Sequence, residues 1–292
     1  MTDLTSIRRA YAQAIAEAAG LQTPGLVDAL ATVPREQFLP PGPWLVMTAG
    51  AARTPPAMTP DADPAHVYQD ASIAIDPDRQ LFNGAPSFLA RMIDLLALKP
   101  GARVLHVGAG TGYYSAVMAH IVGPAGHVIA TEVDAVLASD AAITLAATPW
   151  AEARHSDSTQ VDGPFDAILV NAGVTHPQES WLDALAPGGR MLLPMTVAMP
   201  AMGPTLGKGV MVLVSKTADG TLVPEVLSFT AIYSAIGLRD AAIEAALGQA
   251  MRRTSFPNLT RLRRDAHDAT EACWLHAERS CLSMEPVTGG SL

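Results

Sequence analysis

The sequence predicts an α/β protein whose Rossmann-like, doubly wound sheet is mostly parallel and has an antiparallel edge. Three observations predict this fold. Strand and helix patterns alternate from residue 86, a glycine-rich turn links the first of these strands to a helix, and the alternation closes on two β patterns at 210–215 and 223–234. With 292 residues, the chain is long enough for one large domain with appendages or for two modest domains.

The region before residue 86 is expected to contain helices and loops. Apolar residues at helical spacing predict one helix over 4–20 and a second over 25–32, which ends before Pro34. Residues 48–66 are rich in Pro, Ala, Thr and Asp and predict a long exposed loop, whereas residues 67–76 predict a strand.

Short strands that are each followed by a helix are typical of parallel βαβ units. The expected strands cover 104–107, 127–131, 165–170 and 190–194, and the expected helices cover 88–98, 111–122, 135–147 and 179–185. The tail that follows predicts mostly helix. We therefore expect three segments: an N-terminal helical and loop segment over 1–76, a Rossmann-like domain over 77–237 and a helical C-terminal extension over 238–292.

The composition indicates a globular protein in a reducing compartment. Hydrophobic residues make up 49% and charged residues 16% of the chain, and the net charge is −9, so broad attraction to nucleic acid or to an anionic membrane is not expected. Cys273 and Cys281 are the only cysteines, which excludes a disulfide-rich secreted scaffold. Residues 1–20 lack a signal-peptide pattern and no apolar run approaches the roughly 20 residues that span a bilayer, so we expect a cytoplasmic protein.

The strongest chemical signal is the segment from Val104 to Ser115, where a strand passes through three alternating glycines into a helix. Glycine lets the backbone turn tightly and approach a ligand closely. The spacing G-x-G-x-G departs from the G-x-G-x-x-G fingerprint of dinucleotide sites, which favours a nucleoside cofactor without a pyrophosphate; the alternative is a purely structural turn. The residues expected to hold the cofactor here are His106, Gly108, Ala109, Gly110, Thr111, Gly112 and Tyr113.

An acidic residue follows the next expected strand. Glu132 lies twenty-four positions after Gly108, where a carboxylate can accept hydrogen bonds from the two hydroxyls of a ribose. We expect Glu132 and its neighbour Val133 to contact the cofactor. Asp134 is the alternative for the ribose role, and a solvated loop carboxylate is the alternative for Glu132 itself.

Two later positions complete the expected cofactor site. Asp157 and Ser158 precede the strand at 165–170, and a carboxylate there can accept a hydrogen bond from an adenine amino group. The alternative is an aspartate that caps a turn. Asn171 follows the same strand, and because ligands of open α/β sheets bind outside the carboxyl ends of the strands, we expect it to line the site.

Taken in order, these motifs resemble the class I methyltransferases, and more closely the protein-L-isoaspartate O-methyltransferase family. The resemblance covers roughly residues 25–235 and implies a Rossmann-like enzyme that uses S-adenosylmethionine as methyl donor and a carboxylate of a protein or peptide as acceptor. The segments that carry it are the glycine turn, Val33-Pro-Arg-Glu-Gln-Phe-Leu-Pro40, Tyr68-Gln-Asp70, 85–92, Leu98-Lys-Pro-Gly-Ala-Arg-Val-Leu105, Phe165-Asp166 and Pro187-Gly-Gly-Arg-Met-Leu-Leu-Pro194.

The chain departs from the family pattern at two places. The family has a Gln-Thr-Ile-Ser segment before the proline matched by Pro86, and its hydroxyl contributes to the active site, whereas this chain has no hydroxyl between Asp76 and Pro86. We take residues 79–86 as the acceptor-side loop, with Asn83 as the candidate catalytic residue; the alternative is an ordinary Asn-Gly turn. His106 stands where the family usually has Glu, and 196–199 is expected to face the acceptor.

Three functions remain open at this point. The first is carboxyl methylation of an isoaspartyl or other peptide, the second is methylation of a small metabolite, and the third is a binding protein for S-adenosylmethionine that acts as an adaptor. No metal is expected, because the spacing of the only potential zinc ligands does not match a standard finger. Those residues are His267, Cys273, His276 and Cys281. The oligomeric state cannot be predicted from the sequence.

Overall fold

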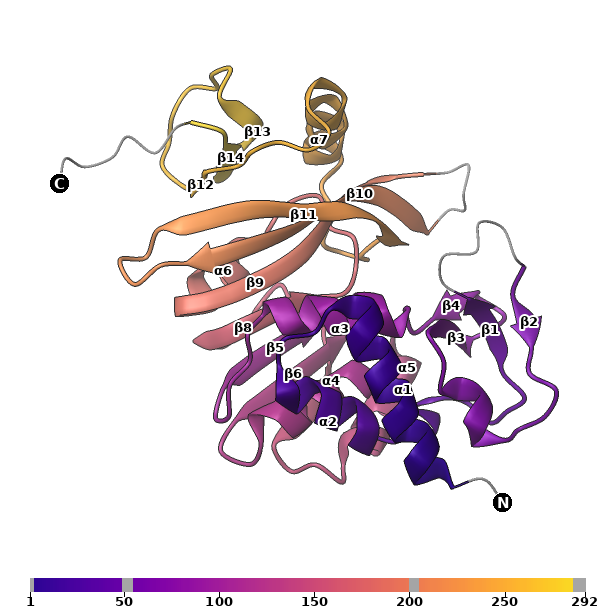
Figure 1. Cartoon of the computed structure of the whole chain (residues 1–292). Helices are drawn as coiled ribbons and strands as arrows, with labels where there is room; N and C mark the ends of the chain where they lie inside the picture. The colour runs from indigo at the N-terminus through magenta and orange to yellow at the C-terminus, as the bar shows by residue number, and fades with distance from the viewer. Residues whose placement is uncertain (1–2, 49–54, 200–204, 286–292) are drawn as a thin grey trace. The chain divides into compact units, whose positions relative to one another are not determined.

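The computed structural model describes residues 3–48, 55–199 and 205–285 and divides the chain into two compact units, residues 1–155 and 156–292 (Figure 1). Within the described residues, none of the helices combines the length and the apolarity that crossing a bilayer requires. The three segments that the sequence predicts, with boundaries at 76 and 237, stay a prediction.

The first unit begins with two packed helices, α1 (Leu4–Ala19) and α2 (Pro24–Thr32). The side chain of Asp3 accepts a hydrogen bond from the Thr5 amide and caps α1, and Gly20 ends it in the left-handed conformation. Both helices lie within one residue of their predicted bounds. Their facing side chains, among them Tyr11, Ile15, Leu26 and Leu30, are buried.

A small antiparallel sheet follows, in the order β2-β1-β3-β4. Its strands are β1 (Leu45–Thr48), β2 (Ala57–Met58), β3 (Ala71–Asp76) and β4 (Leu81–Phe82), and two short 3-10 helices, η1 (Arg35–Phe38) and η2 (Pro64–Val67), flank it. The predicted loop at 48–66 therefore contains β2 and most of η2, and residues 49–54 lie outside the described part of the chain. The predicted strand at 67–76 starts later because Asp63 and Pro64 begin η2.

Three parallel strands form the core of the first unit, in the order β5-β6-β7. They are β5 (Arg103–Val107), β6 (His127–Glu132) and β7 (Ala151–His155), and they alternate with α3 (Pro86–Leu95), α4 (Tyr113–Val122) and α5 (Ala135–Leu145). The sequence did not predict β7. This strand lies at the edge and only Ala151 of it is buried, so its residues lack an apolar pattern.

The second unit continues with one parallel and two antiparallel pairings. Strand β8 (Phe165–Val170) runs parallel to β9 (Leu185–Ala198), and α6 (Glu179–Ala184) connects them. Strands β10 (Leu206–Lys216) and β11 (Leu222–Tyr233) then pair antiparallel with β9 and with each other. The predicted fold class, a mostly parallel series that ends in an antiparallel edge, is confirmed.

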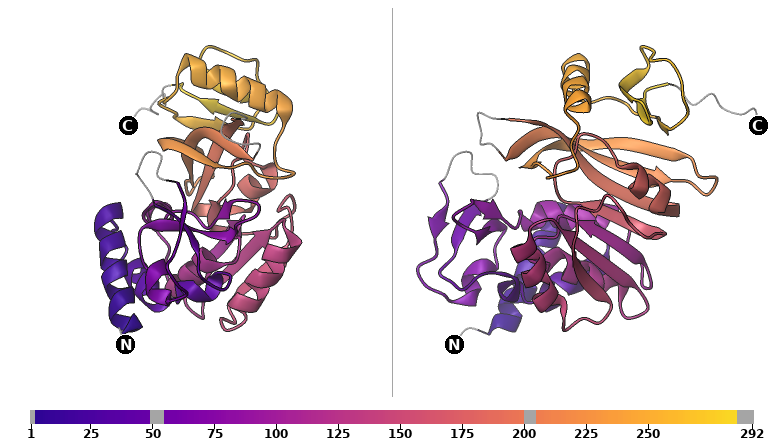
Figure 2. Two further views of the ribbon diagram at one scale, coloured as in Figure 1. Left: turned by 90° about the vertical axis from the view of Figure 1, so that its right-hand side faces the viewer. Right: turned by 180° about the vertical axis from the view of Figure 1, so that it is seen from behind.

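The C-terminal residues correct one expectation. A single helix, α7 (Ala241–Arg253), is followed by a three-stranded antiparallel sheet in the order β12-β14-β13, drawn in yellow in Figure 2. Its strands are β12 (Arg261–Arg263), β13 (Cys273–Ala277) and β14 (Ser280–Ser283). The prediction of a mostly helical tail was wrong beyond residue 253, because strands of three to five residues are too short to show a periodic pattern.

Candidate cofactor site

The glycine turn is fixed between β5 and β6. The amides of Gly108 and Ala109 donate hydrogen bonds to the Thr131 carbonyl oxygen over 2.9 and 3.0 Å. Gly108, Gly110 and Gly112 have φ values of 74°, 57° and 94°, all in the left-handed region that other residues avoid. The sequence thus specifies glycine at each point where the backbone reverses, and the turn presents main-chain atoms rather than side chains.

Glu132 is held directly against this turn. Its Oε2 atom accepts a hydrogen bond of 2.8 Å from the Gly110 amide, and its Oε1 atom accepts bonds of 2.9 and 3.1 Å from the amides of Val133 and Asp134. The side chain is only partly buried. A carboxylate has about four lone-pair positions, so one remains here for a ligand hydroxyl, and a second becomes available if the Gly110 bond opens.

Asp134, the alternative for the ribose role, is already engaged. Its Oδ1 atom accepts hydrogen bonds from the amides of Val136 and Leu137 and caps α5, and its Oδ2 atom pairs with Arg79. The bond from Arg79 and the bonds from the helix amides hold the pKa of Asp134 below its ordinary value. This geometry favours Glu132 over Asp134 as the ribose acceptor.

Three side chains of the predicted set support the turn from the interior. His106 is fully buried and its Nδ1 atom lies 2.7 Å from the Ser115 hydroxyl, while the Thr111 hydroxyl donates to the Phe38 carbonyl oxygen. Tyr113 is buried against Phe38. His106 has no exposed surface, and Thr111 and Tyr113 have very little, so these side chains pack beneath the turn. A contact of these residues with the cofactor stays a prediction.

Burial lowers the pKa of His106 from 6.5 to about 3. The unfolded chain, with a histidine pKa near 6.5, binds a proton at a higher pH than the folded protein does. The folded state therefore has its full stability above pH 6.5 and loses stability as the pH falls toward 3. We expect the His106→Gln variant to lose less unfolding free energy between pH 6.5 and 4 than the parent, by up to about 1.4 kcal/mol per pH unit. Urea titrations at each pH measure the change of unfolding free energy with pH. The control His66→Gln makes the same substitution in η2, where the side chain is not buried. Equal slopes for the parent and His106→Gln would contradict the assignment.

The segment before α3 lies beside the same turn. A Cβ atom added at Gly110 would stand 3.3 Å from Cδ1 of Ile75 on β3, and Arg79 bridges Asp76 and Asp134. Residues 75–79 therefore border the glycine turn and the end of β6. This places the start of the predicted acceptor-side loop next to the residues predicted to bind the donor.

Asn83 is anchored by one end of its carboxamide. Its Oδ1 atom accepts hydrogen bonds from the Ile73 amide over 2.9 Å and from Arg35 Nη2 over 3.2 Å. Its Nδ2 atom is buried and has no hydrogen-bond partner among the described residues. The anchored oxygen fits the structural-turn alternative, whereas the unpartnered amide group is a donor that a carboxylate could use.

Arg35 is a residue whose role the sequence did not reveal. The side chain is fully buried and donates to the carbonyl oxygens of Val67, Gln69 and Ala71, as well as to Asn83. The guanidinium carbon lies 5.9 Å from the centre of the Tyr113 ring. Arg35 thus ties η1 and β3 to the helix that follows the glycine turn. Its place in the Val33–Pro40 motif was the available signal, but burial of a charged side chain cannot be inferred from a motif.

In the second unit, the predicted adenine-side residues have local roles. Asp157 is exposed, and its Oδ1 atom accepts hydrogen bonds from the amide and the hydroxyl of Thr159, which hold its pKa below the ordinary value. This is the turn-capping arrangement that the sequence left open. Ser158 is buried with φ of 60°, and its carbonyl oxygen accepts a hydrogen bond from Trp181. Asn171 is half-buried directly after β8.

The segment 196–199 is covered at Thr196 and more open beyond it, with Ala198 exposed. Thr196 is fully buried, and its hydroxyl and carbonyl oxygens accept hydrogen bonds of 2.9 Å from Arg239. The Ala198 amide donates to Glu244 Oε1. The expectation that this segment faces the acceptor is corrected at Thr196, because an arginine from the segment before α7 covers its polar atoms.

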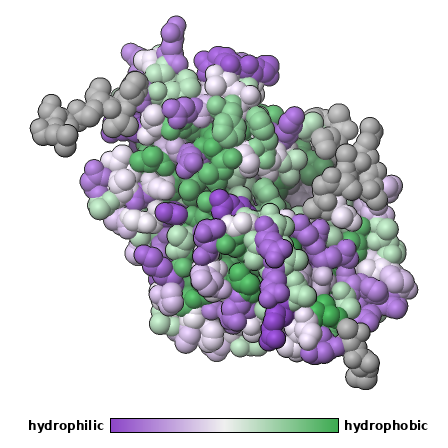
Figure 3. All heavy atoms as spheres, viewed as in Figure 1, coloured by the Kyte–Doolittle hydropathy of each residue, from purple (hydrophilic) through white to green (hydrophobic). Residues whose placement is uncertain are grey.

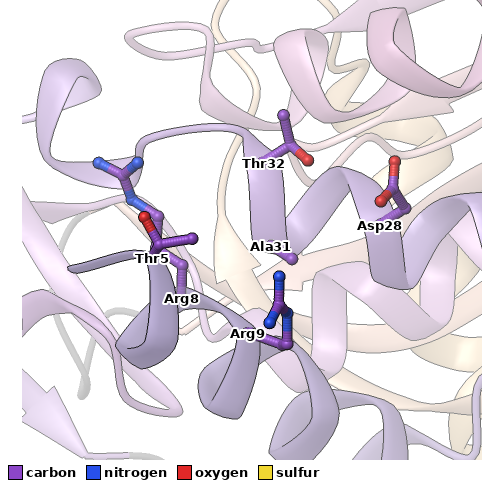
Figure 4. A pocket seen from close by; sticks show the side chains of 6 residues that line it. All are labelled: Thr5, Arg8, Arg9, Asp28, Ala31 and Thr32. Atoms are coloured by element: carbon purple, nitrogen blue, oxygen red, sulfur yellow. The ribbon is translucent and has the colours of Figure 1, made fainter. Parts of the chain in front are cut away.

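Two other surface features lie apart from these residues. A hollow of about 280 Å³ lies between α1 and α2 and is lined by Thr5, Arg8, Arg9, Asp28, Ala31 and Thr32 (Figure 4). In the second unit, Phe229 of β11 and Phe256 after α7 are about half exposed, with ring centres 5.7 Å apart. Figure 3 shows hydrophobic residues gathered over the strands of the second unit. Neither feature includes a residue of the predicted cofactor site.

Comparison with known proteins identifies the relatives of the chain. The family model described as protein-L-isoaspartate(D-aspartate) O-methyltransferase matches residues 57–229. A protein-L-isoaspartate O-methyltransferase of Methanopyrus kandleri is 38% identical over 134 residues, which are 44% of this chain and 58% of that protein. The chain therefore matches less than two thirds of the length of this relative.

Two solved structures have the same fold. One, a protein-L-isoaspartate O-methyltransferase, has a TM-score of 0.63 at 19% identity over 96% of this chain and 88% of its own. The other, a Plasmodium falciparum protein described as a putative protein-L-isoaspartate O-methyltransferase in complex with S-adenosyl-L-homocysteine, has a TM-score of 0.59 at 19% identity over 78% of this chain and 98% of its own.

Proposed function

Because the chain belongs to the protein-L-isoaspartate(D-aspartate) O-methyltransferase family, we propose that it methylates the free α-carboxylate of isoaspartyl residues in proteins or peptides, with S-adenosylmethionine as the donor. The observation that carries this proposal is the carboxylate of Glu132, held by the Gly110 amide at the end of a parallel strand. Nucleoside cofactors of open α/β sheets bind at this edge.

The residues of the site fit S-adenosylmethionine. Gly108 and Gly110 are only partly buried and carry no side chain that would keep a ligand from the turn, and Glu132 keeps hydrogen-bond acceptor capacity for ribose hydroxyls. When bound, S-adenosylmethionine supplies a sulfonium-activated methyl group. The acceptor carboxylate is already ionised near neutral pH, so the protein needs no general base for this reaction. Its residues have to align the acceptor oxygen with the methyl carbon and exclude water.

The proposal is tested by methyl transfer from labelled S-adenosylmethionine to an isoaspartyl peptide and to its normal aspartyl twin. We expect label in the isoaspartyl peptide alone. Donor binding without transfer to either peptide would contradict the isoaspartyl acceptor and would favour a different peptide or a small metabolite. Donor binding without turnover on any acceptor would favour the adaptor function.

We further propose that Asn83 orients the acceptor through its unpartnered Nδ2 group. The Asn83→Asp variant keeps an oxygen for Ile73 and Arg35 but replaces the donor group by a second oxygen. We expect methyl transfer to fall at least about 10-fold, since one hydrogen bond to a charged acceptor contributes about 1.5–3 kcal/mol. Affinity for S-adenosylmethionine is expected to stay unchanged.

The matched control for this experiment is Asn258→Asp, which makes the same substitution at an exposed position. Initial rates at saturating donor, together with donor affinity by calorimetry, separate the two effects. Full methyl transfer by Asn83→Asp would leave Asn83 with a structural role only.

We propose a cytoplasmic location for the protein. Both cysteines are free, the net charge is −9, and no helix of the described residues is suited to cross a membrane. Fractionation of cells that produce a tagged chain tests this proposal. Recovery of the chain in the membrane fraction or in an oxidising compartment would contradict it.

A further inference from the structure

The C-terminal sheet brings four potential metal ligands together in the second unit. They are His267, Cys273, His276 and Cys281, and one ligand atom of each lies within 4.8 Å of the ligand atoms of the others. The four residues come from three places: the loop before β13, strand β13 itself and strand β14. None of them belongs to the predicted cofactor site, so the proposed methyl transfer does not account for them.

Strand geometry explains how these side chains converge. His276 and Cys281 are directly opposite each other in the antiparallel pair β13–β14. Cys273 and His276 are three positions apart, and in a regular strand they would point to opposite faces. The register shifts between Cys273 and Leu275, and such a bulge turns Cys273 to the face of His276. The bulge thus places the Cys273 side chain on the same face of the sheet as His276 and Cys281.

The side chains are oriented as metal ligands are. Nδ1 of His276 is buried and has no hydrogen-bond partner among the described residues. The Nδ1 atom of His267 forms a hydrogen bond of 2.8 Å with the Asp265 carbonyl oxygen. Its Nε2 atom lies 3.8 Å from Cys273 Sγ and is available as a ligand atom. A backbone partner on the outer ring nitrogen is the usual arrangement behind a metal-bound histidine.

Both thiols are buried and unbridged, in different electrostatic surroundings. Burial raises the pKa of Cys273, but hydrogen bonds from the Thr270 amide and hydroxyl and from Cys281 and His267 bring it down to about 6. Burial and the neighbouring Cys273 raise the pKa of Cys281 to about 12. Neither sulfur is part of a disulfide, so both are available as metal ligands.

We propose that His267, Cys273, His276 and Cys281 form a structural zinc site, which reverses the expectation from the sequence that the chain binds no metal. Two thiolates and two imidazoles are a soft, four-coordinate set that suits Zn²⁺. Zn–S and Zn–N bonds of about 2.3 and 2.0 Å place tetrahedral ligands roughly 3.3–3.8 Å apart, so the cluster needs to contract only slightly. Four protein ligands leave no open position, so the ion stabilises the sheet and takes no part in catalysis.

The first test is the metal content of the full-length, untagged chain, purified under reducing conditions and dialysed against zinc and then against metal-free buffer. We expect about one zinc ion per chain by mass spectrometry of the metal. Cobalt substitution should add a thiolate-to-cobalt charge-transfer band and the intense visible bands of tetrahedral cobalt. The chain has only two cysteines, so any such charge-transfer band reports on this site.

Variants locate the ligands. Cys281→Ser and His276→Gln are expected to reduce bound zinc at least 10-fold, and Cys281→Ser to reduce the charge-transfer band strongly. The control His127→Gln changes a histidine of the first unit, outside the cluster, and should bind zinc as the parent does. If a cysteine variant does not fold, zinc removal from the parent by a chelator replaces it. A lowered melting temperature that added zinc restores is the result expected there.

Two results would overturn the proposal. One is a reduced, folded parent protein that keeps less than about one tenth of an equivalent of zinc and gives no charge-transfer band with cobalt. The other is a parent whose Cys273 and Cys281 form a disulfide, seen as a mass two hydrogens lower, and which takes up no zinc after reduction. The methyl-transfer assay is independent of these measurements, so failure of one proposal leaves the other standing.

Discussion

Replacing Glu132 by glutamine is expected to weaken the binding of S-adenosylmethionine by about 10- to 100-fold, because hydrogen bonds to a charged group contribute about 1.5–3 kcal/mol. The substitution keeps the size of the side chain and one acceptor oxygen. It removes the charge that holds the amides of Gly110, Val133 and Asp134. Two effects therefore act together: fewer acceptors for the ribose and a less rigid glycine turn.

Isothermal titration calorimetry with S-adenosylmethionine measures the loss, and circular dichroism verifies that the Glu132→Gln variant folds. The control Glu17→Gln makes the same change on the exposed face of α1. Parent-like affinity in a folded Glu132→Gln variant would remove Glu132 from the cofactor site and return the ribose role to Asp134 or to main-chain atoms.

Replacing Arg35 by methionine is expected to cost about 3–5 kcal/mol of unfolding free energy. The side chain is fully buried, and its nitrogens donate to three carbonyl oxygens of residues 67–71 and to Asn83. Methionine fills similar volume but leaves these buried acceptors without donors, and each unsatisfied group costs about 1–3 kcal/mol.

Urea denaturation of the variants gives the unfolding free energies. Arg9→Met is the matched control, because Arg9 is exposed on α1 and should change stability by less than about 0.5 kcal/mol. Arg35→Lys should fall between the parent and Arg35→Met, because one ammonium group cannot reach the acceptors of both Nη1 and Nη2. A loss below about 1 kcal/mol for Arg35→Met would show that water replaces the missing donors.

The sequence predicted the elements that are long, apolar or ended by strong signals. Strand β8 was predicted residue for residue because it is buried and apolar, and α1 was predicted to within one residue because its apolar residues recur at helical spacing. Strand β7 was missed because edge exposure leaves it polar, and β12–β14 were missed because each strand is so short. Periodicity reports burial on one face, so elements with little buried surface give no periodic signal.

For the candidate site, the sequence predicted which main-chain turn and which carboxylate lie together, and Glu132 does contact Gly110. It could not predict which side chains point inward. Thr111, Tyr113 and His106 were assigned to the ligand but are buried under the turn. The sequence named His267, Cys273, His276 and Cys281 as potential metal ligands but could not predict that they come together, because the bulge after Cys273 changes which residues share a face and leaves no mark in ligand spacing.

The hydrogen bond between Gly110 and Glu132 also bears on turnover. A carboxylate with no hydrogen-bond partner in the free protein would bind its ligand tightly, but release of S-adenosylhomocysteine would then leave the carboxylate without a partner and would be slow. With the ribose role that we propose for Glu132, the Gly110 amide can donate to Oε2 again each time the ligand leaves. Arrival and departure then exchange one hydrogen bond for another, which lowers the net gain from binding and speeds dissociation. We expect an enzyme built this way to favour rapid release of S-adenosylhomocysteine over tight retention of it.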